Sequence, residues 1–305
     1  MLPVIAVLVA ALLFGTTGTA QALGPDGTTP LAVGVARMVV GGTALALVAF
    51  VLAARARRRG AARPALTARP LVLMAVTGVA LTVYQPLFFL GTETNGVAVS
   101  TVIALGSAPV IAGLVEWALT RRVPSGVWLS ATGLATAGVV LLGIGGGEAG
   151  AADPVGVLAA VGAGASFAVI ANAQRALLDD GWDPFTVVGA MGASSAALSA
   201  AAVPFVDLAW VADPRGILMT LWLGVATIAV AYALFTWGLH GLTAATAATL
   251  TLGEPLTATI LGVAVLGERL SLLAILGLVV LALGLATLAW GSRRARDPIP
   301  FAVEG

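Results

Sequence analysis

Ten apolar stretches follow one another along almost the whole chain, separated by short segments that hold most of its arginines and turn-forming residues. A helix that rises 1.5 Å per residue needs about 20 residues to cross the roughly 30 Å hydrocarbon core of a bilayer. A helix is also the natural spanning structure, because it pairs its own backbone polar groups. The pattern therefore predicts an all-α membrane protein with spans at 2–22, 31–54, 70–91, 96–119, 126–144, 155–174, 184–204, 216–238, 243–271 and 272–290.

Composition agrees with this pattern and limits the chemistry. Of the 305 residues, 59% are hydrophobic and only 10% are charged. A soluble protein of this length presents more polar surface to water. The chain has no cysteine and a single histidine, His240, which excludes disulfides, thiolate metal sites and multi-histidine metal centres. We therefore expect neither a metal nor an organic cofactor.

The first apolar stretch has a second interpretation. Ala20-Gln21-Ala22 fits the small-residue pattern of a signal-peptide cleavage site, but the residues before the stretch, Met1-Leu2-Pro3, include no basic side chain. We interpret the stretch as a retained helix.

The basic residues, all arginines, are unevenly divided between the two sides of the predicted bundle. With the N-terminus in the cytoplasm, twelve of the fifteen fall on that side, Arg215 and Arg269 fall on the other, and Arg37 lies within the second span. The arginine-rich segment from Arg55 to Arg69 would suit nucleic acid or anionic lipid, yet between two spans the positive-inside rule explains it better. We predict a multi-pass protein of the inner membrane that contacts the lipid bilayer, has both termini in the cytoplasm and binds no nucleic acid.

A carboxylate stands near the middle of the ninth stretch, residues 243–271. Glu254 is followed by Pro255, and the next charge is Glu268. A charge at that depth costs about 2.5–3.5 kcal/mol on insertion scales, so an intramembrane carboxylate usually has a function. Pro255 has no N–H, which predicts a kink and leaves the carbonyl of Thr251 without its helical partner. A glutamate that only holds two helices together is the structural alternative.

An internal repeat relates the two halves of the chain. Residues 106–138 align with residues 252–284 at a constant shift of 146, so that the two prolines expected to kink their helices, Pro109 and Pro255, coincide. Two halves of five spans each must insert in opposite senses, and inverted repeats of this kind surround a midplane site in secondary transporters. We therefore predict two inverted five-helix repeats around a central cavity. Their bounds are 1–148 for the first repeat, 149–291 for the second, and 292–305 for a cytoplasmic tail.

Three classes of function fit a ten-span chain: a secondary transporter, a passive facilitator or channel, and a membrane-embedded enzyme. An enzyme needs a nucleophile with a base, or a metal, and the chain has no H-E-x-x-H, no cysteine and no G-x-S-x-G. The G-x-G-x-x-G match at 145–150 follows a membrane span rather than a strand, so it does not indicate a nucleotide site. We predict that the protein is not an enzyme. A facilitator stays open, because it differs from a transporter in kinetics and not in fold.

Several segments of the chain resemble those of a known family. The segments YALFTWG (232–238) and GEPLTATILGVAVLGERL (253–270), the latter followed by a glycine-rich tenth span, resemble the EamA type of the drug/metabolite transporter superfamily. Arg37 matches a basic residue usual in that family's second helix. The first repeat departs from the pattern, because Thr120-Arg121-Arg122 stands where a Gly-Glu pair is expected. The resemblance covers nearly the whole chain, and it implies transport, usually export, of amino acids, metabolites or toxic compounds through a cavity lined by helices 1, 3, 4, 6, 8 and 9.

Polar residues at mid-depth on those helices are then the candidates for substrate contacts. They are Thr16, Thr17, Tyr84, Gln85, Ser107, Ser166, Tyr232, Trp237 and Glu254. Tyr84, Gln85 and Glu254 are the strongest of these, because a serine or threonine commonly bonds back to its own helix. Trp237 suits the aromatic belt at the membrane interface equally well. Arg37 either lies at the cavity mouth or extends its long side chain outward, so that the guanidinium leaves the apolar interior.

Glu254 also suggests how transport is driven. Removing a carboxylate from water disfavours its charged form, so a proton can compete with the ammonium group of a zwitterionic or cationic substrate. We expect a small-molecule substrate and protons as the partners of this residue.

Overall fold

The computed structural model describes residues 2–58, 64–121, 124–146, 153–267 and 269–294. Within these ranges the chain forms helices and turns, and ten segments are long and apolar enough to cross a membrane. They are Leu2–Ala22, Pro30–Arg55, Ala68–Asn95, Val99–Thr120, Gly126–Ile144, Pro154–Asp179, Pro184–Phe205, Pro214–Leu239, Ala244–Leu266 and Leu272–Gly291. Their ends lie within five residues of the spans predicted from the sequence, which confirms the all-α, ten-span fold.

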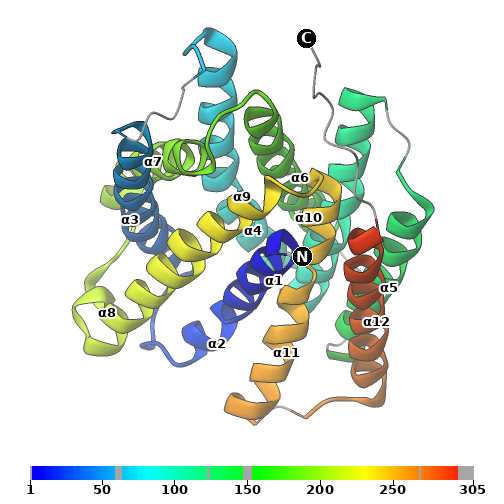
Figure 1. Ribbon diagram of the computed structural model, residues 1–305. Helices are drawn as coiled ribbons and strands as arrows, with labels where there is room; N and C mark the ends of the chain where they lie inside the picture. The colour runs from blue at the N-terminus through cyan, green and yellow to red at the C-terminus, as the bar shows by residue number, and fades with distance from the viewer. Residues whose placement is uncertain (1, 59–63, 122–123, 147–152, 268, 295–305) are drawn as a thin grey trace.

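The helical elements do not correspond one to one with these spans (Figure 1). Their bounds are α1 (Leu2–Gly15), α2 (Thr17–Ala22), α3 (Pro30–Arg58), α4 (Ala68–Thr120), α5 (Gly126–Gly146), α6 (Pro154–Asp179), α7 (Pro184–Ala202), η1 (Val203–Phe205), η2 (Ala209–Ala212), α8 (Pro214–Leu221), the π-helical η3 (Trp222–Val230), α9 (Ala231–Leu239), α10 (Ala244–Leu250), α11 (Gly253–Leu266) and α12 (Leu272–Arg294). The first, seventh, eighth and ninth spans are each divided between two or more elements. The third and fourth spans share one element.

That shared element, α4, has 53 residues and would be about 80 Å long if it were straight. Because this is more than twice the thickness of a hydrocarbon core, the two spans in it cannot form one straight helix. Figure 1 shows the chain turning back, so that both ends of α4 lie on the same side of the molecule. The sequence placed a break at 92–95, whereas helical backbone continues through these residues.

Three helices begin with the same Asp-Pro pair, at Asp153, Asp183 and Asp213. In each case the carboxylate accepts a hydrogen bond from the backbone N–H two residues later, at 2.7 to 3.0 Å. The proline occupies the first helical position, where no N–H is needed. These caps fix where α6, α7 and α8 start.

Small residues allow the helices of the bundle to approach closely. A β-carbon added to Gly42 of α3 would come within 2.7 Å of the carbonyl oxygen of Gly192 in α7, and the reverse substitution meets Gly42 in the same way. Gly138 of α5 and Gly284 of α12, which the repeat aligns with each other, both lie in the α5–α12 interface. Such contacts replace the hydrophobic effect as the packing force inside a membrane. The placement of the two glycines is consistent with the predicted repeat.

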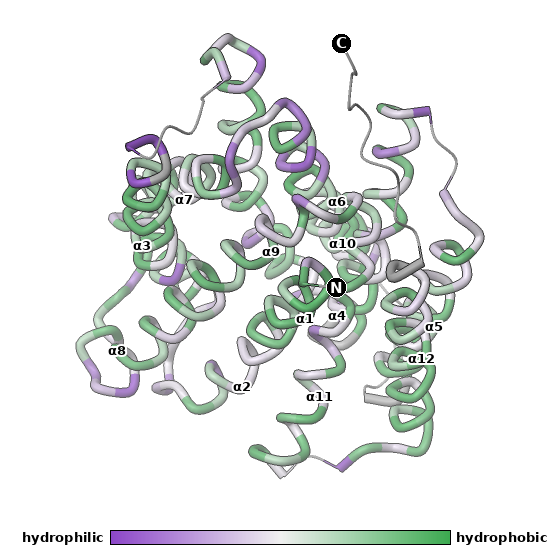
Figure 2. The backbone as a smooth tube through the Cα atoms, in the orientation of Figure 1, coloured by the Kyte–Doolittle hydropathy of each residue, from purple (hydrophilic) through white to green (hydrophobic). Residues whose placement is uncertain are grey.

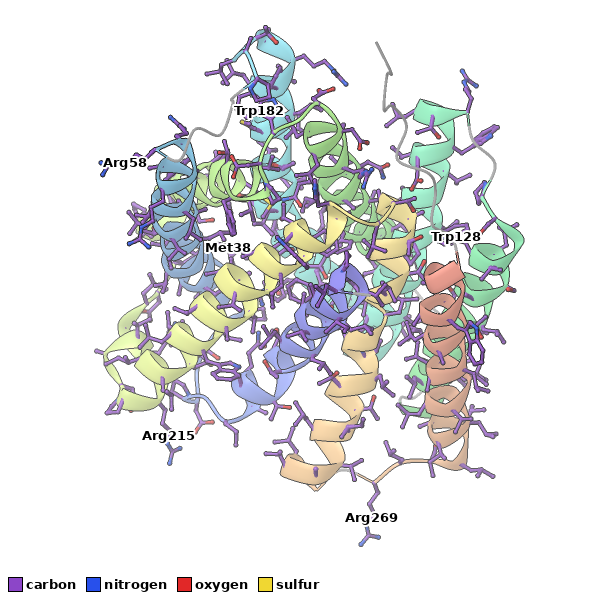
Figure 3. All side chains as sticks on the ribbon, in the orientation of Figure 1. Met38, Arg58, Trp128, Trp182, Arg215 and Arg269 are labelled. Atoms are coloured by element: carbon purple, nitrogen blue, oxygen red, sulfur yellow. The ribbon has the colours of Figure 1, made fainter. Side chains whose placement is uncertain are left out.

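Charged residues divide between two ends of the molecule. Figure 3 shows Arg58 and Trp182 at one side and Arg215 and Arg269 at the opposite side, and Figure 2 shows that most hydrophilic segments lie at helix ends. We call the first side, which in the described residues carries Arg55, Arg57, Arg58, Arg69, Arg121 and Arg175, the arginine-rich end. Several residues used in the sequence analysis, among them Arg59, Arg63, Arg122, Glu268 and the tail from 295 on, lie outside the described residues.

Candidate functional site

A cavity of about 250 Å³ lies among seven spans, bounded by α1 and α2, α3, the two halves of α4, α6, α9, and the junction of α10 with α11. Its opposite charges are Arg37 on α3 and Glu254 on α11. Other polar side chains in its wall are those of Thr17, Gln21, Tyr84, Gln85, Thr101, Tyr232 and Thr251. A mostly apolar hollow with a few convergent polar groups is the usual form of a small-molecule site.

Glu254 occupies the first turn of α11, just after a break in the ninth span. α10 ends at Leu250, and the N–H of Glu254 donates to the carbonyl oxygen of Thr251 at 2.9 Å. The predicted free carbonyl at Thr251 is therefore wrong, because a tighter turn supplies it with a donor one residue before Pro255. Pro255 then lies within the first turn of α11, where a missing N–H is tolerated.

The N-terminal helix approaches this turn closely. A β-carbon on Gly15, the last residue of α1, would come within 2.6 Å of the carbonyl oxygen of Glu254. Only glycine leaves room for the backbone of α1 at this point. The first span, which consists of α1 and α2, thereby forms one wall of the cavity through Phe14, Gly15 and Thr17.

Arg37 faces the cavity in the neighbourhood of Glu254 and two tyrosines. It interacts electrostatically with Tyr232, Tyr84 and Glu254. Its buried Nε has no hydrogen-bond partner among the described residues. The ion pairs found in the described part of the chain join other residues, Arg69 with Asp180 and Arg175 with Asp179. Arg37 and Glu254 thus present opposite charges to one cavity without closing on each other in an ion pair.

Gln85 adds a second donor. Its side chain is only 5% exposed, and its Nε2 has no hydrogen-bond partner among the described residues. Leaving a buried donor unsatisfied costs about 1–3 kcal/mol, so such a group usually has a reason to be there. Because Gln85 lines the cavity, a ligand with an acceptor group would satisfy it.

Aromatic rings cover much of the remaining wall. Tyr84 stacks on Phe88 with ring centroids 5.8 Å apart, and Phe14 meets Tyr232 edge-on at 5.1 Å. The phenylalanines Phe14, Phe88, Phe89 and Phe167 also line the cavity, and they were not predicted from the sequence because the candidates were chosen for polarity. The spacing of Tyr84 and Phe88, four residues apart, places both on one helix face and would have indicated the second ring.

Some of the residues predicted for the cavity do line it, and others do not. Those that do are Thr17, Arg37, Tyr84, Gln85, Tyr232, Glu254 and Pro255. Thr16 donates to the carbonyl of Leu13 at 2.7 Å, Ser107 to that of Ala104 at 3.2 Å and Ser166 to that of Gly162 at 2.9 Å. These three therefore bond back to their own helices, which is the alternative that the sequence left open.

Trp237 also lies away from the cavity. It is 39% exposed and borders a separate, apolar groove formed by α1, α3, α7, η3 and α9. The position suits contact with lipid better than contact with a polar substrate.

The two predicted kinks differ from each other. The ninth span is interrupted next to Pro255, as expected, but α4 continues as a helix through Pro109, so the expected interruption is absent there. Pro109 is buried and does not line the cavity. The two prolines that align in the predicted repeat therefore differ in whether they interrupt their helix.

The cavity is closed on one side and more open on the other. Toward the arginine-rich end its walls pass into fully buried residues, among them Ala112 of α4 and Ala168 of α6. In the opposite direction the lining includes the exposed Gly18, on α2. Figure 1 shows α2 and the end of α11 on the side where Arg269 lies in Figure 3.

The arrangement can bind a zwitterion. A carboxylate suits Arg37 and the Gln85 amide, an ammonium group suits Glu254, and the aromatic rings accept an apolar substituent. Within the described residues no group of three or more histidine, cysteine, aspartate or glutamate side chains could hold a metal ion.

Two comparisons with known proteins indicate a membrane transporter, and a third supports the fold. The model of the EamA-like transporter family matches residues 1–144 and 154–290. A protein of Bacillus subtilis (strain 168) described as "Uncharacterized transporter YwfM" is 40% identical over 290 residues, covering 95% of this chain and 94% of that protein. A solved structure titled "Crystal structure of protein" has a TM-score of 0.76 and 18% identity, over 94% of this chain and 98% of the other, which supports the fold alone.

Proposed function

The chain belongs to the EamA-like transporter family of membrane transporters, and from this premise we propose that it is a secondary active transporter that exports amino acids or other small metabolites or toxic compounds, driven by protons that bind Glu254. One observation carries the proposal: a single carboxylate and a single guanidinium, Glu254 and Arg37, face the same cavity inside a ten-span bundle. Opposite charges that stay apart leave room for a substrate carrying both.

In this mechanism the proton and the substrate ammonium group compete for Glu254. When the cavity opens to the side of higher proton concentration, a proton binds and the substrate leaves. When it opens to the other side, the proton leaves and a new substrate binds. Because the proton and the substrate exchange on the same carboxylate, transport of one is linked to transport of the other, although the two ligands do not contact each other.

The membrane arrangement follows from the same proposal. The protein lies in the inner membrane with the arginine-rich end and both termini in the cytoplasm. Its halves, 1–148 and 149–291, act as inverted repeats that rock against each other around the cavity. The structure would then have its cavity open toward the outside.

Transport by purified protein in liposomes tests the proposal. A panel of amino acids and cationic compounds is offered with and without an imposed pH gradient. We expect saturable uptake that the gradient accelerates, and Glu254→Gln should lower gradient-driven uptake at least about tenfold, the loss typical for one charged hydrogen bond. Glu93→Gln, which removes an exposed carboxylate on α4, is the matched control and should transport normally.

A passive facilitator of the same fold gives a different result. Its uptake would be saturable and indifferent to the pH gradient, and Glu254→Gln would alter affinity only. Normal pH-dependent transport by folded Glu254→Gln protein would mean that the carboxylate is structural, and the coupling proposed here would be wrong. An enzyme is disfavoured because the family and the Bacillus relative are both described as transporters.

A further inference from the structure

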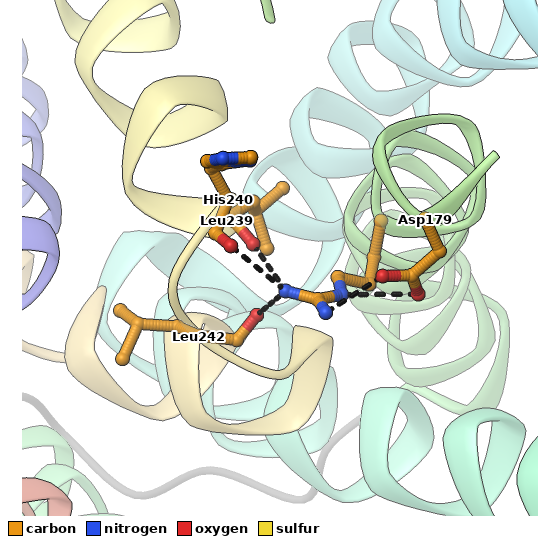
Figure 4. Close-up of polar contacts among 5 residues, drawn as sticks. Asp179, Leu239, His240 and Leu242 are labelled. Atoms are coloured by element: carbon orange, nitrogen blue, oxygen red, sulfur yellow. Dashed lines mark hydrogen bonds and ion pairs between the residues drawn. The ribbon is translucent and has the colours of Figure 1, made fainter. Parts of the chain in front are cut away.

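The turn between the eighth and ninth spans, residues 239–245, is held by a guanidinium from another helix. Arg175, near the end of α6, donates from Nη1 to the carbonyl oxygen of Leu239 at 2.7 Å and to that of Leu242 at 2.8 Å (Figure 4). A longer contact of 3.4 Å reaches the carbonyl of His240. The side chain of Arg175 thus binds backbone carbonyl groups at three positions of the turn.

The contacts suit the end of a helix. α9 ends at Leu239, and the last carbonyl groups of a helix lack intrahelical partners and carry partial negative charge. Asp179, one turn further along α6, binds Nε at 3.1 Å and Nη2 at 2.7 Å and so fixes the plane of the guanidinium. Only arginine can bind a carboxylate with two nitrogens and present a third to the carbonyls.

A carboxylate from a third helix holds the other half of the turn. Oε2 of Glu116, on α4, accepts the backbone N–H of Ala245 at 2.8 Å. Ala245 lies in the first turn of α10, where N–H groups lack partners and a negative charge is favourable. We call Arg175 and Glu116, with the turn that they hold, the gate clasp.

A fully buried contact between small side chains lies between the gate clasp and the cavity. Ala112 of α4, Ala168 of α6 and Ala248 of α10 pack together and are each 0% exposed. One turn deeper, the same helices reach the cavity, for example at Ala108 and Gly164. The three alanines therefore form a plug, and the gate clasp holds together the helices that carry it.

We propose that the gate clasp closes the arginine-rich end of the cavity, and that it must break for the cavity to open there. This inference rests on the proposed transport function, because only alternating access requires this end to open. It goes beyond that function by assigning a role in gating to two residues that do not line the cavity. Breaking the gate clasp should raise the fraction of protein molecules whose cavity is open at the arginine-rich end.

The absence of cysteine from the chain makes this population measurable. A single reporter, Ala168→Cys, is introduced in the plug, and a membrane-impermeant maleimide is added at the arginine-rich end without substrate or pH gradient. Adding Arg175→Gln should accelerate labelling at least about tenfold, because the loss of even one charged hydrogen bond changes a population by that much. Asp179→Asn, which only loosens the guanidinium, should act in the same direction with a smaller effect.

The matched control removes a different arginine at the same end. Arg69 forms an ion pair with Asp180 at 2.7 Å and does not hold the 239–245 turn, so Arg69→Gln should leave labelling of Ala168→Cys unchanged. A second reporter, Gly18→Cys at the open side, should react more slowly from that side in the Arg175→Gln protein. This reciprocity separates a shift of state from general loosening, in which both reporters would react faster.

The inference is overturned if folded Arg175→Gln protein labels at the rate of Arg69→Gln, or if both reporters accelerate together. If Arg175→Gln does not fold, Arg175→Lys keeps the charge but loses the fork of donors, and it should give an intermediate acceleration. Because no substrate or gradient is used, this result does not depend on whether Glu254 couples protons.

Discussion

The backbone N–H of Glu254 donates to the carbonyl oxygen of Thr251 at 2.9 Å, across the break between α10 and α11. A hydrogen bond of this reach, three residues rather than four, tightens the chain at the point where it would otherwise continue as one helix. The break places Glu254 in the first turn of α11 and turns its side chain into the cavity. The position of the carboxylate therefore depends on Pro255, which denies the continuous helix its hydrogen bond.

Replacing this proline should damage transport without unfolding the protein. Pro255→Ala restores the missing N–H, so α10 and α11 can join into one helix, and Glu254 then rotates away from the other cavity residues. We expect a clear loss of transport in liposomes with an unchanged amount of folded protein. Pro109→Ala is the control, because α4 is already helical through Pro109 and should keep its shape. Equal losses in the two variants would contradict this account.

The charge of Arg37 should discriminate between substrates. If its guanidinium binds a substrate carboxylate, Arg37→Gln removes a charge-assisted contact worth about 1.5–3 kcal/mol, or roughly tenfold or more in affinity. An amino acid should lose this much apparent affinity, while the amine that lacks its carboxyl group should lose little. Counterflow measured with such a pair of compounds checks the prediction. A similar loss for both compounds would mean that Arg37 supports the cavity rather than the substrate.

Replacing Gln85 should stabilise the folded protein and weaken substrate binding. Its Nε2 is buried without a partner in the described structure, an arrangement that costs about 1–3 kcal/mol. Gln85→Leu has similar volume and removes the unsatisfied donor, so the folded protein should melt at a higher temperature in detergent. Transport should fall, because the substrate loses a hydrogen bond. A variant that melts lower and transports normally would show that the amide has a structural partner instead.

The sequence predicted the number and place of the spans because length and apolarity alone decide whether a helix can cross a bilayer. The sequence also predicted that Glu254 lines the cavity, because a lone carboxylate at that depth is costly and stands out in an apolar span. The serines and threonines were less tractable. Thr17 lines the cavity, whereas Thr16 bonds back to Leu13, and neighbouring positions of the same type differ only in the helix face they occupy.

Other features depended on contacts between distant residues. The turn at Thr251 depended on the backbone path on both sides of Pro255, whereas the helix of α4 continues through Pro109. Arg175 was visible in the sequence only as one of many arginines at the expected cytoplasmic side. Its bonds to Leu239 and Leu242 join residues more than sixty positions apart, and no local pattern reports such a contact.

Packing between α5 and α12 gives a stability prediction with its own internal control. A β-carbon on Gly138 would come within 2.7 Å of Cα of Leu281, whereas one on Gly133, on the same helix, would meet no atom within 4 Å. Gly138→Ala forces the two helices apart and should lower the free energy of unfolding by about 1–3 kcal/mol, as overpacking usually does. Gly133→Ala relieves the entropic cost of glycine in a helix and should raise the free energy of unfolding by about 0.5–1 kcal/mol.

Thermal unfolding of the two purified variants in one detergent should therefore shift in opposite directions. Both substitutions add one methyl group to one helix, so a difference in sign can come only from the close approach of α12. Two shifts of the same sign would mean that the helices do not meet at Gly138.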